Sequence, residues 1–191
     1  MVTRIRLNRG ADNENVEASI VNLSNKTCGG FDNIWMELLR LHQQDDKFWD
    51  LELKLLMVSR QDYEGYAVEY NDQAEGILIL ETQLHGSQIT RGKRLVYVSY
   101  IATAPWNREI IQRPPKLQGV GTALLLFAQN RSLELGYSGR VGLHSLPGYE
   151  KFYDNRGMLD LGSDPDYENL VYFEYGVWQQ QYYETDEFEY E

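Results

Sequence analysis

The stretch KLQGVGTALLLFAQN, residues 116–130, decides how the sequence is interpreted. Gly119 and Gly121 stand one residue apart, directly before an apolar run whose hydrophobic residues recur at helical spacing. This run predicts a helix that begins near Val120 and ends near Gly136. Because glycine costs about 1 kcal/mol relative to alanine inside a helix, two glycines at the start of one require a reason.

The glycine pair does not fit the two common nucleotide-binding loops. A P-loop requires GxxxxGK[ST], whereas Gly121 is followed by Thr122 and Ala123. A dinucleotide fingerprint, GxGxxG/A, requires Gly or Ala where Leu124 stands. A third arrangement holds a pyrophosphate on backbone N–H groups at a helix N-terminus, where glycine permits close approach. The alternative is structural, since glycines also relieve a tight turn and let a helix pack close to a sheet. The residues leave both interpretations open.

Length and composition indicate a single globular domain over residues 1–191. The chain is 42% hydrophobic and 25% charged, which suffices for one core and is short for two domains. No run of about 18 apolar residues is present and residues 1–15 lack a signal-peptide core, so we expect no membrane association and a cytoplasmic location. Cys28 is the only cysteine, and we expect it to be structural or incidental; no metal-binding cluster is indicated.

The acidic residues are concentrated at the C-terminal end. The net charge of −11 makes nucleic acid a poor partner, because binding to a phosphate backbone requires a basic face. The last eight residues, ETDEFEYE, contain no basic residue. The tail over residues 179–191 is open to two interpretations: a solvated, mobile end, or a segment whose acidic and aromatic residues cover a basic surface on a partner.

The first half of the chain predicts strands around one helix. Residues 3–8 alternate as a half-buried strand, and residues 32–44 carry a helical apolar face with Asp32 as the candidate N-cap. Residues 49–55 fit a strand or a helix, so that the region 1–62 is the least defined. The β-branched and aromatic runs that follow predict an antiparallel meander beginning with a hairpin, over residues 63–70, 76–85 and 94–103.

The second half adds helices to this sheet. The remaining patterns predict a proline-bounded loop over 104–116, the helix from Val120, a strand over 139–145, a short helix over 148–157 and a strand over 169–178. The order strands, helix, strand, helix, strand indicates a mixed α/β (α+β) fold with a largely antiparallel central sheet flanked by helices.

Three stretches together resemble the GNAT family of acetyl-CoA-dependent N-acetyltransferases: YIATAPWN at 100–107, KLQGVGTALL at 116–125 and GLHSLPGYEKFYDNRGM at 142–158. The family pattern [Q/R]-x-x-G-x-[G/A] matches both glycines, with Lys116 in place of Gln or Arg. The resemblance covers about residues 63–175, and two motifs in the right order make it fairly specific.

The second family pattern, A-x-x-F-Y-x-x-x-G-[F/M], also matches. The matching residues are Phe152, Tyr153, Gly157 and Met158, with Tyr149 where alanine is usual. A bulky residue at position 149 could narrow the cofactor cleft. At position 116, we expect the substitution to be tolerated because backbone amides make most of the phosphate contacts in the family, and lysine still supplies a positive charge.

The resemblance implies an enzyme that moves an acetyl group from acetyl-CoA to a primary amine by direct attack, without a covalent enzyme intermediate. It implies that the pantetheine arm and the thioester carbonyl contact the backbone of Ile101, Ala102 and Thr103. It places the cofactor phosphates on Lys116, Leu117, Gln118, Gly119, Val120, Gly121 and Thr122. Tyr153 takes the family role of the general acid that protonates the leaving thiolate.

The general base is less well indicated. Many members of the family place a carboxylate on the strand before the thioester site, but residues 97–100 contain none. Candidates on neighbouring strands are Glu69, Glu81 and His85, of which we select Glu81. His144 is also near the predicted cleft, but a lone histidine is more often a satisfied structural residue.

Two other functions stay open. The departures at Lys116 and Tyr149 and the missing carboxylate suit a catalytically inactive GNAT-fold protein that binds CoA. The acidic tail suits an interaction protein. For an enzyme, the acidic surface favours a cationic acceptor, either a small-molecule or a peptide amine. The acceptor and the oligomeric state, a homodimer included, stay open.

Overall fold

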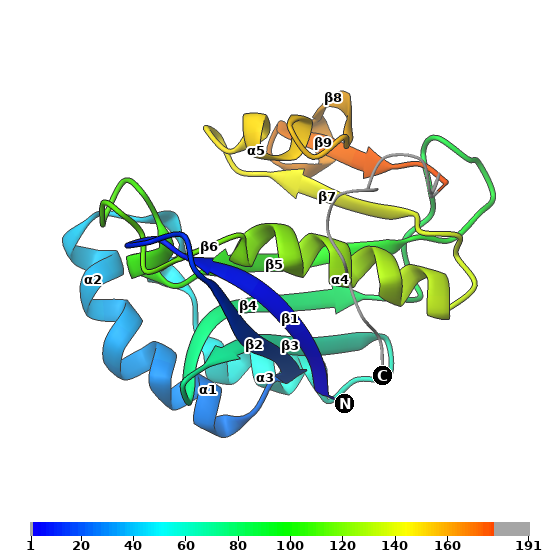
Figure 1. Ribbon diagram of the computed structural model, residues 1–191. Coiled ribbons are helices and arrows are strands. Elements are labelled where there is room, and N and C mark those ends of the chain that lie inside the picture. Colours follow the sequence, from blue (N-terminus) through cyan, green and yellow to red (C-terminus); the bar gives the residue numbers. More distant parts are fainter. Residues whose placement is uncertain (1, 178–191) are drawn as a thin grey trace. The chain divides into compact units, whose positions relative to one another are not determined.

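The computed structural model describes residues 2–177, apart from the side chains of residues 28, 30, 32 and 33 (Figure 1). These residues form two compact units, which we describe separately. The first unit comprises residues 2–81 and 99–126, and the second comprises residues 82–98 and 127–177. The predicted acidic tail, residues 179–191, lies outside the described residues. The expectation of a single domain stays a prediction.

The strands and helices follow the order that Figure 1 labels. The strands are β1 (Val2–Arg9), β2 (Asn15–Asn22), β3 (Tyr63–Tyr70), β4 (Gln73–Glu81), β5 (Val96–Thr103), β6 (Leu117–Gln118), β7 (Val141–Ser145), β8 (Leu159–Asp164) and β9 (Leu170–Tyr175). The α-helices are α1 (Asn25–Gly30), α2 (Met36–Leu41), α3 (Leu51–Val58), α4 (Val120–Glu134) and α5 (Glu150–Asp154). A π-helical turn (Phe31–Trp35) joins α1 to α2, and short 3-10 turns include η2 (Asp45–Phe48) and η3 (Pro105–Asn107).

The first unit is built on an antiparallel sheet with the strand order β6-β1-β2-β3-β4-β5. β1 pairs with β2 and with β6, and β3 pairs with β2 and with β4, in each case antiparallel. The predicted hairpin between β3 and β4 is confirmed: Asn71 and Asp72 occupy its turn with φ of 50° and 61°. Two successive left-handed residues suit the right-handed twist of paired strands.

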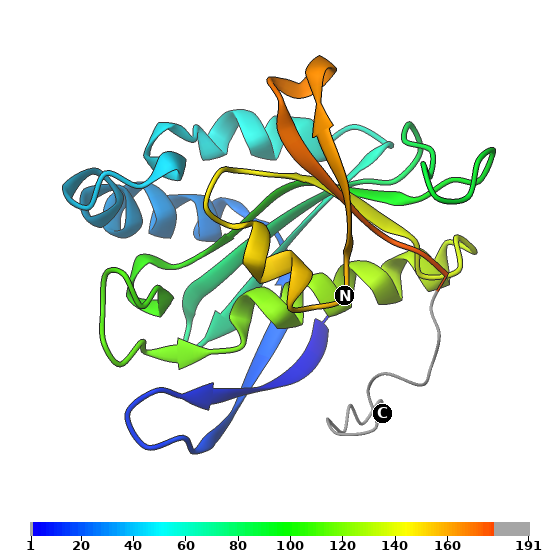
Figure 2. The ribbon, with the colours of Figure 1, turned by 90° about the horizontal axis from the view of Figure 1, so that it is seen from above.

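Helices cover both faces of this sheet (Figure 2). On one face, α1 to α3 bury Phe31, Trp35 and Leu51 in a cluster with Ile77 and Ile79 of β4. On the other face, the start of α4 lies close to the sheet at Gly76 of β4, where an added Cβ would lie 2.7 Å from Val120 Cγ1. At this point the close packing of the helix on the sheet depends on a glycine in the strand.

The second unit has the strand order β5-β7-β9-β8, with the first three residues of β5 contributing. β5 and β7 pair in parallel through Val96↔Val141 and Tyr97↔Gly142, whereas β7 with β9 and β8 with β9 pair antiparallel. The mixed, largely antiparallel fold that the sequence predicts is confirmed.

The end of α4 also agrees with the prediction. Gly136 has a φ of +78°, its N–H donates to Leu133 O at 2.9 Å, and Tyr137 N–H donates to Ser132 O at 2.7 Å. This pair of bonds is the Schellman motif, in which a left-handed glycine lets the last turn satisfy its carbonyl groups.

Several N-terminal predictions were wrong or incomplete. The helix predicted at 32–44 begins at Asn25 and passes through a π-helical turn, so Asp32 lies within helical backbone and cannot be its N-cap. The ambiguous segment 49–55 is helical, because α3 begins at Leu51 and Asp50 Oδ1 accepts from Leu53 N–H at 2.9 Å. β2, β6 and β8 were not predicted, and the strand predicted at 76–85 ends at Glu81.

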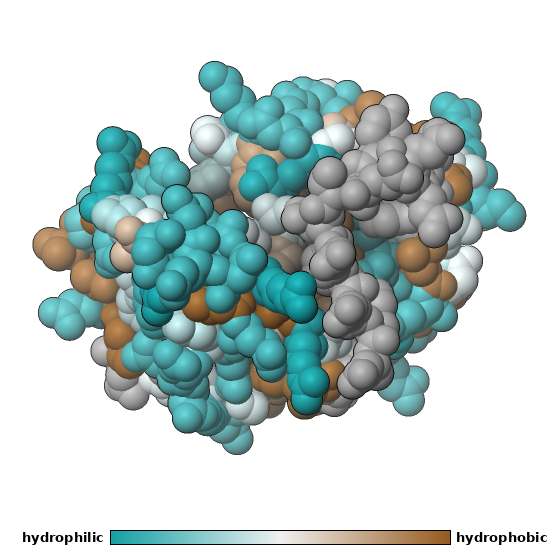
Figure 3. Space-filling model, viewed as in Figure 1, coloured by the Kyte–Doolittle hydropathy of each residue, from teal (hydrophilic) through white to brown (hydrophobic). Residues whose placement is uncertain are grey.

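Part of the surface of the first unit is apolar. Figure 3 shows hydrophobic residues over α2, at the left of the view, and Leu41 at the end of this helix is 71% exposed. Phe48 of η2 and Leu53 and Leu56 of α3 are also exposed. Among the helices of residues 2–177, none is both long enough and apolar enough to span a membrane.

Candidate functional site

The residues predicted for the site are divided between the two units. Glu81, the stretch Ile101–Thr103 and the loop Lys116–Thr122 belong to the first unit, and Tyr153 belongs to the second. Within the first unit, Ala102 of β5 and Val120 of α4 both lie close to Gly76 on β4, whereas Glu81 stands five residues further along that strand, at its end.

The glycine loop connects a short strand directly to α4. β6 pairs with β1 through Asn8↔Gln118, and Gly119 O accepts the N–H of Ala123 at 2.8 Å, which places the first helical residue at Val120. The N–H groups of the first turn have no carbonyl partner within the helix, and the positive end of the helix dipole lies there. The predicted arrangement of strand, glycine and helix is therefore present.

The two glycines have different structural reasons. Gly119 has a φ of +89°, a conformation that favours glycine, and a Cβ added there would meet only Leu7 Cδ2, at 3.7 Å. The turn thus accounts for Gly119 without any ligand. Gly121 lies inside α4 and has no positive φ, so the backbone does not require glycine there. Its place in the first turn is what close approach of a ligand would explain.

Lys116, the first residue of the loop, is held by a buried carboxylate. Lys116 Nζ forms an ion pair with Glu75 Oε1 and donates to Gln73 Oε1 at 2.8 Å. Glu75, on β4, is completely buried, whereas the lysine side chain is 31% exposed. The positive charge expected here is present, but Glu75 already neutralises it.

Glu75 also accepts hydrogen bonds from the η3 turn. Trp106 Nε1 donates to Glu75 Oε2 at 2.6 Å, and Asn107 Nδ2 donates to the same oxygen at 2.8 Å. Asn107 Oδ1 in turn accepts the N–H of Leu117 at 2.9 Å. One buried carboxylate therefore ties β4, η3 and the strand that leads into the glycine loop.

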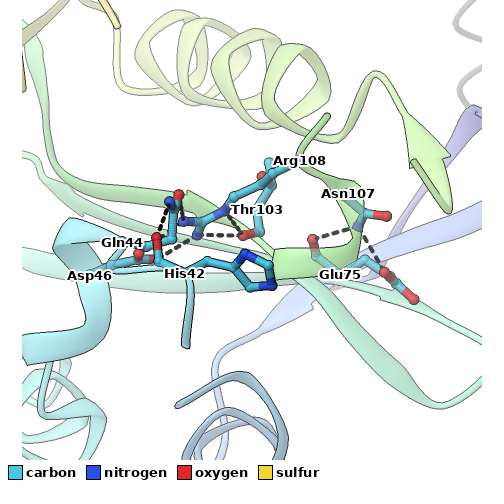
Figure 4. Close-up of polar contacts among 7 residues, drawn as sticks. All are labelled: His42, Gln44, Asp46, Glu75, Thr103, Asn107 and Arg108. Atoms are coloured by element: carbon cyan, nitrogen blue, oxygen red, sulfur yellow. Dashed lines mark hydrogen bonds and ion pairs between the residues drawn. The ribbon is translucent and has the colours of Figure 1, made fainter. Parts of the chain in front are cut away.

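A second polar cluster fixes the end of β5 (Figure 4). The Arg108 guanidinium donates to Thr103 O from Nε at 3.0 Å and from Nη2 at 2.7 Å, and pairs through both Nη atoms with the buried carboxylate of Asp46. Gln44 Oε1 accepts from Nη1 at 3.2 Å. The Thr103 carbonyl, one of the groups predicted to meet the cofactor arm, is therefore engaged by Arg108.

The predicted bases Glu81 and Glu69 lie on strands of the first unit. Glu81 ends β4, is completely buried and lies opposite Tyr63 in the hairpin register. Burial raises the pKa of the Tyr63 phenol, Arg60 opposes this effect and the Glu81 carboxylate adds to it. Glu69 lines a surface pocket with Trp35 and Trp106.

Tyr153 has a packed ring and a free hydroxyl. The ring contacts Phe152 and Phe173, with centroids 5.1 and 5.5 Å away, and the residue is 7% exposed. Among residues 2–177, no side chain or backbone group hydrogen-bonds its hydroxyl. Burial raises the pKa of Tyr153 to about 12, with a smaller contribution from Tyr149 that Arg156 opposes.

The motif around Tyr153 ends its helix. Gly157 has a φ of +76°, its N–H donates to Asp154 O at 2.9 Å, and the N–H of Met158 donates to Tyr153 O at 3.2 Å. Met158 is buried. Gly157 therefore caps the helix, and Met158 anchors the cap in the core. Of the four residues that match the family pattern, Tyr153 is the one whose side chain carries a hydroxyl group that could transfer a proton.

His144 of β7 is a member of a polar and aromatic network. Its Nε2–H donates to Asp164 Oδ2 at 3.1 Å, so that Nδ1 accepts from the Tyr97 hydroxyl at 2.8 Å. Its ring stacks on Tyr167 at 3.9 Å, and His85 stacks on Tyr97 at 4.0 Å. Burial lowers the pKa of His144, and Asp164 opposes this effect. The neutral, hydrogen-bonded ring supports the structural interpretation of His144.

Sequence reasoning missed the residues that position the loop. Glu75 and Arg108 lie outside the three stretches that carry the family resemblance, and Asn107 ends the first of them without a role assigned to it. The Asn107–Glu75 and Arg108–Asp46 contacts join residues 32 and 62 positions apart along the chain. A signal was present at Glu75, a charged residue directly before the apolar run GILIL of a strand. A buried carboxylate in such a place requires donors, and Trp106, Asn107 and Lys116 provide them.

The fold is that of the GNAT acetyltransferases. A search with the sequence found no matching family model and no matching curated protein. Among solved structures, the GNAT domain of S. lividans PAT aligns with a TM-score of 0.65 at 14% identity, over 91% of this chain and 96% of that chain.

Two further structures were solved with CoA compounds. PaiA N-acetyltransferase from Thermoplasma acidophilum, in complex with coenzyme A, aligns with a TM-score of 0.55 at 15% identity, over 83% of this chain and 98% of its own. AAC(6')-Iy, in complex with the bisubstrate analogue CoA-S-monomethyl-acetylneamine, gives a TM-score of 0.53 at 14% identity, over 73% and 89%.

The buried carboxylate generates a prediction about stability. Glu75→Ala should lower the free energy of unfolding by about 3–5 kcal/mol, because it leaves the donors of Trp106, Asn107 and Lys116 without their acceptor. Lys26→Met, which removes the exposed pair with Asp72, is the control and should cost at most about 1 kcal/mol. Urea denaturation measures both. Equal small losses would show that the carboxylate does not organise the loop.

The His144 network predicts a pH dependence. A histidine whose pKa is lowered by folding binds its proton more readily when unfolded, so stability is lost as the pH falls below the ordinary value of 6.5. The loss is at most about 1.4 kcal/mol per pH unit for one proton. His144→Gln should flatten the difference between unfolding free energies at pH 7.5 and 5.5. An unchanged pH profile in this variant would contradict the assignment.

Proposed function

We propose that the chain is an N-acetyltransferase of the GNAT family that moves an acetyl group from acetyl-CoA to a primary amine by direct attack. The observation that carries the proposal is Gly121, a glycine in the first turn of α4 that the backbone does not require. The motif match around it and the GNAT fold support the same interpretation. PaiA and AAC(6')-Iy, which were solved with CoA compounds, have similar folds.

The glycine loop would bind the phosphates through its backbone. Val120 and Gly121 offer N–H groups at the positive end of α4, and glycine at 121 leaves room for a phosphate oxygen to come close. The side chain of Lys116 is engaged by Glu75, so its contribution would be to hold the loop. Acetyl-CoA itself supplies the thioester that the acceptor amine attacks.

The thioester would lie along β5 at Ile101 and Ala102. Here Arg108 already occupies the carbonyl of Thr103, so the backbone groups of residues 101 and 102 and the N–H of Thr103 are the ones proposed to meet the pantetheine arm. Attack of the amine forms the C–N bond, the C–S bond breaks, and the thiolate of CoA leaves.

Tyr153 is proposed as the donor to this thiolate. With its pKa raised to about 12, full proton transfer to a thiolate of pKa about 8.5 is uphill by roughly 5 kcal/mol. A hydrogen bond from the unpaired hydroxyl, which stabilises the leaving thiolate, is the role that this pKa favours. Glu81 remains the proposed general base, which would take a proton from the acceptor amine, because it places a carboxylate on β4.

An inactive CoA-binding protein is the alternative function. It is favoured by the neutralised Lys116 and by residues 97–100 of β5, which contain no carboxylate. The two functions share the glycine loop and differ in turnover, so binding and catalysis are tested separately.

The glycine loop generates the binding test. Acetyl-CoA should raise the melting temperature of the protein, and Gly121→Ala should remove most of this rise, because the added Cβ obstructs the phosphates. The same substitution should stabilise the free protein by up to about 1 kcal/mol, since alanine is the better helix residue. Gly119→Ala should instead destabilise it by about 1–2 kcal/mol, because of its positive φ.

Gly29→Ala is the matched control for this test. Gly29 is also a helical glycine, and a Cβ added to it meets nothing within 4 Å. The Gly29→Ala substitution should leave the rise in melting temperature caused by acetyl-CoA unchanged. If no CoA ester alters the melting temperature of the unmodified protein, both the enzyme and the inactive binder are rejected.

Turnover is tested at Tyr153. Tyr153→Phe keeps the ring packing and removes the hydroxyl, so kcat for thiol release from acetyl-CoA with a panel of primary amines should fall by about 10²-fold. The acetyl-CoA melting shift should be retained. A rate equal to that of the unmodified protein would make Tyr153 a packing residue, and binding without any thiol release would favour the inactive alternative.

A further inference from the structure

Lys54 is a buried lysine whose amine faces two aromatic rings. It lies on α3 and is 8% exposed. Its Nζ lies 3.4 Å from the ring centroid of Tyr100 on β5 and 4.9 Å from the ring centroid of Trp49. Trp49 and Tyr100 contact each other edge to face, with centroids 5.2 Å apart. The amine therefore lies against an aromatic wall formed by two separate elements.

This amine differs from those of Lys116, Lys26 and Lys47 in its partners. Lys116 is paired with Glu75, Lys26 with Asp72, and Lys47 donates to Gln43 Oε1. Among the described residues, Lys54 Nζ has no hydrogen-bond acceptor and no carboxylate at ion-pair distance. Asp50, the N-cap residue one turn earlier, is the charged group that acts on it.

The surroundings keep a large share of the amine neutral. Burial lowers the pKa of Lys54 to about 8, and the Asp50 carboxylate only partly opposes this effect. An exposed lysine has a pKa of about 10.4, so at pH 8 it is almost entirely charged. The neutral amine is the nucleophilic form of lysine, and desolvation is one of the ways in which proteins activate it.

One of the rings that the amine contacts belongs to the residue before the proposed donor site. Tyr100 directly precedes Ile101 and Ala102, where the proposed function places the thioester. Tyr100 and Ala102 point into the same aromatic and aliphatic cluster under α1 to α3. Lys54 approaches β5 from this face, in the same unit as the glycine loop.

We propose that Lys54 is a modification site, the acceptor of an acetyl group that the protein transfers to itself from acetyl-CoA. The inference rests on the proposed function for its donor. Nζ attacks the thioester carbonyl carbon, a C–N bond forms and the C–S bond breaks. The amine loses one proton and the departing thiolate gains one, so the products are acetyl-lysine and CoA.

Acetylation would change how α3 contacts the sheet. The amide carries no positive charge, so the attraction between the ammonium group and the faces of Tyr100 and Trp49 is lost. A larger, polar group then occupies a place between α3 and β5. The acetyl group would then lie against the aromatic wall of Trp49 and Tyr100, next to the proposed donor site.

The test follows the acetyl group directly. The full-length protein is incubated with acetyl-CoA at pH 8, the intact mass is measured, and the modified residue is mapped by peptide mass spectrometry. The expected result is a single acetyl group on Lys54. Lys54→Arg and Lys54→Met should both remove it, whereas Lys93→Arg, which changes an exposed lysine, should not. Circular dichroism establishes that the Lys54 variants are folded.

The pH dependence separates this site from surface chemistry. The rate at Lys54 should level off above about pH 9, whereas exposed lysines become about tenfold more reactive per pH unit up to about pH 10. Gly121→Ala should reduce the rate in proportion to the loss of acetyl-CoA binding. A label distributed over Lys26, Lys47 and Lys93, or a rate at Lys54 that keeps rising with pH, would overturn the proposal.

The effect of acetyl-CoA on the melting temperature shows whether only the self-acetylation is rejected or the proposed function as well. If acetyl-CoA raises the melting temperature and external amines are acetylated, but Lys54 stays unmodified, the self-acetylation is rejected and the proposed function stands. If acetyl-CoA neither binds nor modifies the protein, both are rejected.

Discussion

The buried carboxylate of Glu75 is the constraint on which the proposed cofactor loop depends. A completely buried charge is tolerated only when donors surround it, and here the donors come from Trp106, Asn107 and Lys116. Each of them belongs to the segment between β5 and α4. The path of that segment, and with it the position at which α4 begins, is therefore fixed by the need to satisfy a charge on β4.

Polar and apolar contacts have different tasks in the first unit. The aromatic and aliphatic cluster under α1 to α3 holds the helices on the sheet, while the Glu75 and Arg108 clusters fix the chain where β5 ends and the loop begins. Lys54 belongs to neither type, because its amine lies against aromatic rings and has no hydrogen-bond acceptor among the described residues. Its exceptional surroundings are the reason for assigning it a chemical role.

Sequence patterns predicted what depends on local periodicity. The α4 helix, its end at Gly136 and the Asn71–Asp72 hairpin were predicted from spacing and turn chemistry. The helix at 25–41 was predicted at 32–44, so both its start and its end were placed too far along the chain; a π-helical turn interrupts its α-helical spacing at Phe31–Trp35. The glycine loop was predicted, but the direction of Lys116 was not, since its partner lies 41 residues earlier on another strand. Such pairings depend on tertiary contacts that no local pattern contains.

The pairing of Lys116 with Glu75 has a consequence for how ionic strength acts on the loop. Attraction between a free lysine and a phosphate extends over about a Debye length and weakens as salt is added. Here the lysine is already neutralised by a partner within the protein, so a phosphate on this loop would be held mainly by backbone amides at hydrogen-bond distance. Under the proposed function, the loop would therefore recognise phosphates by contact and shape rather than draw anions in from a distance.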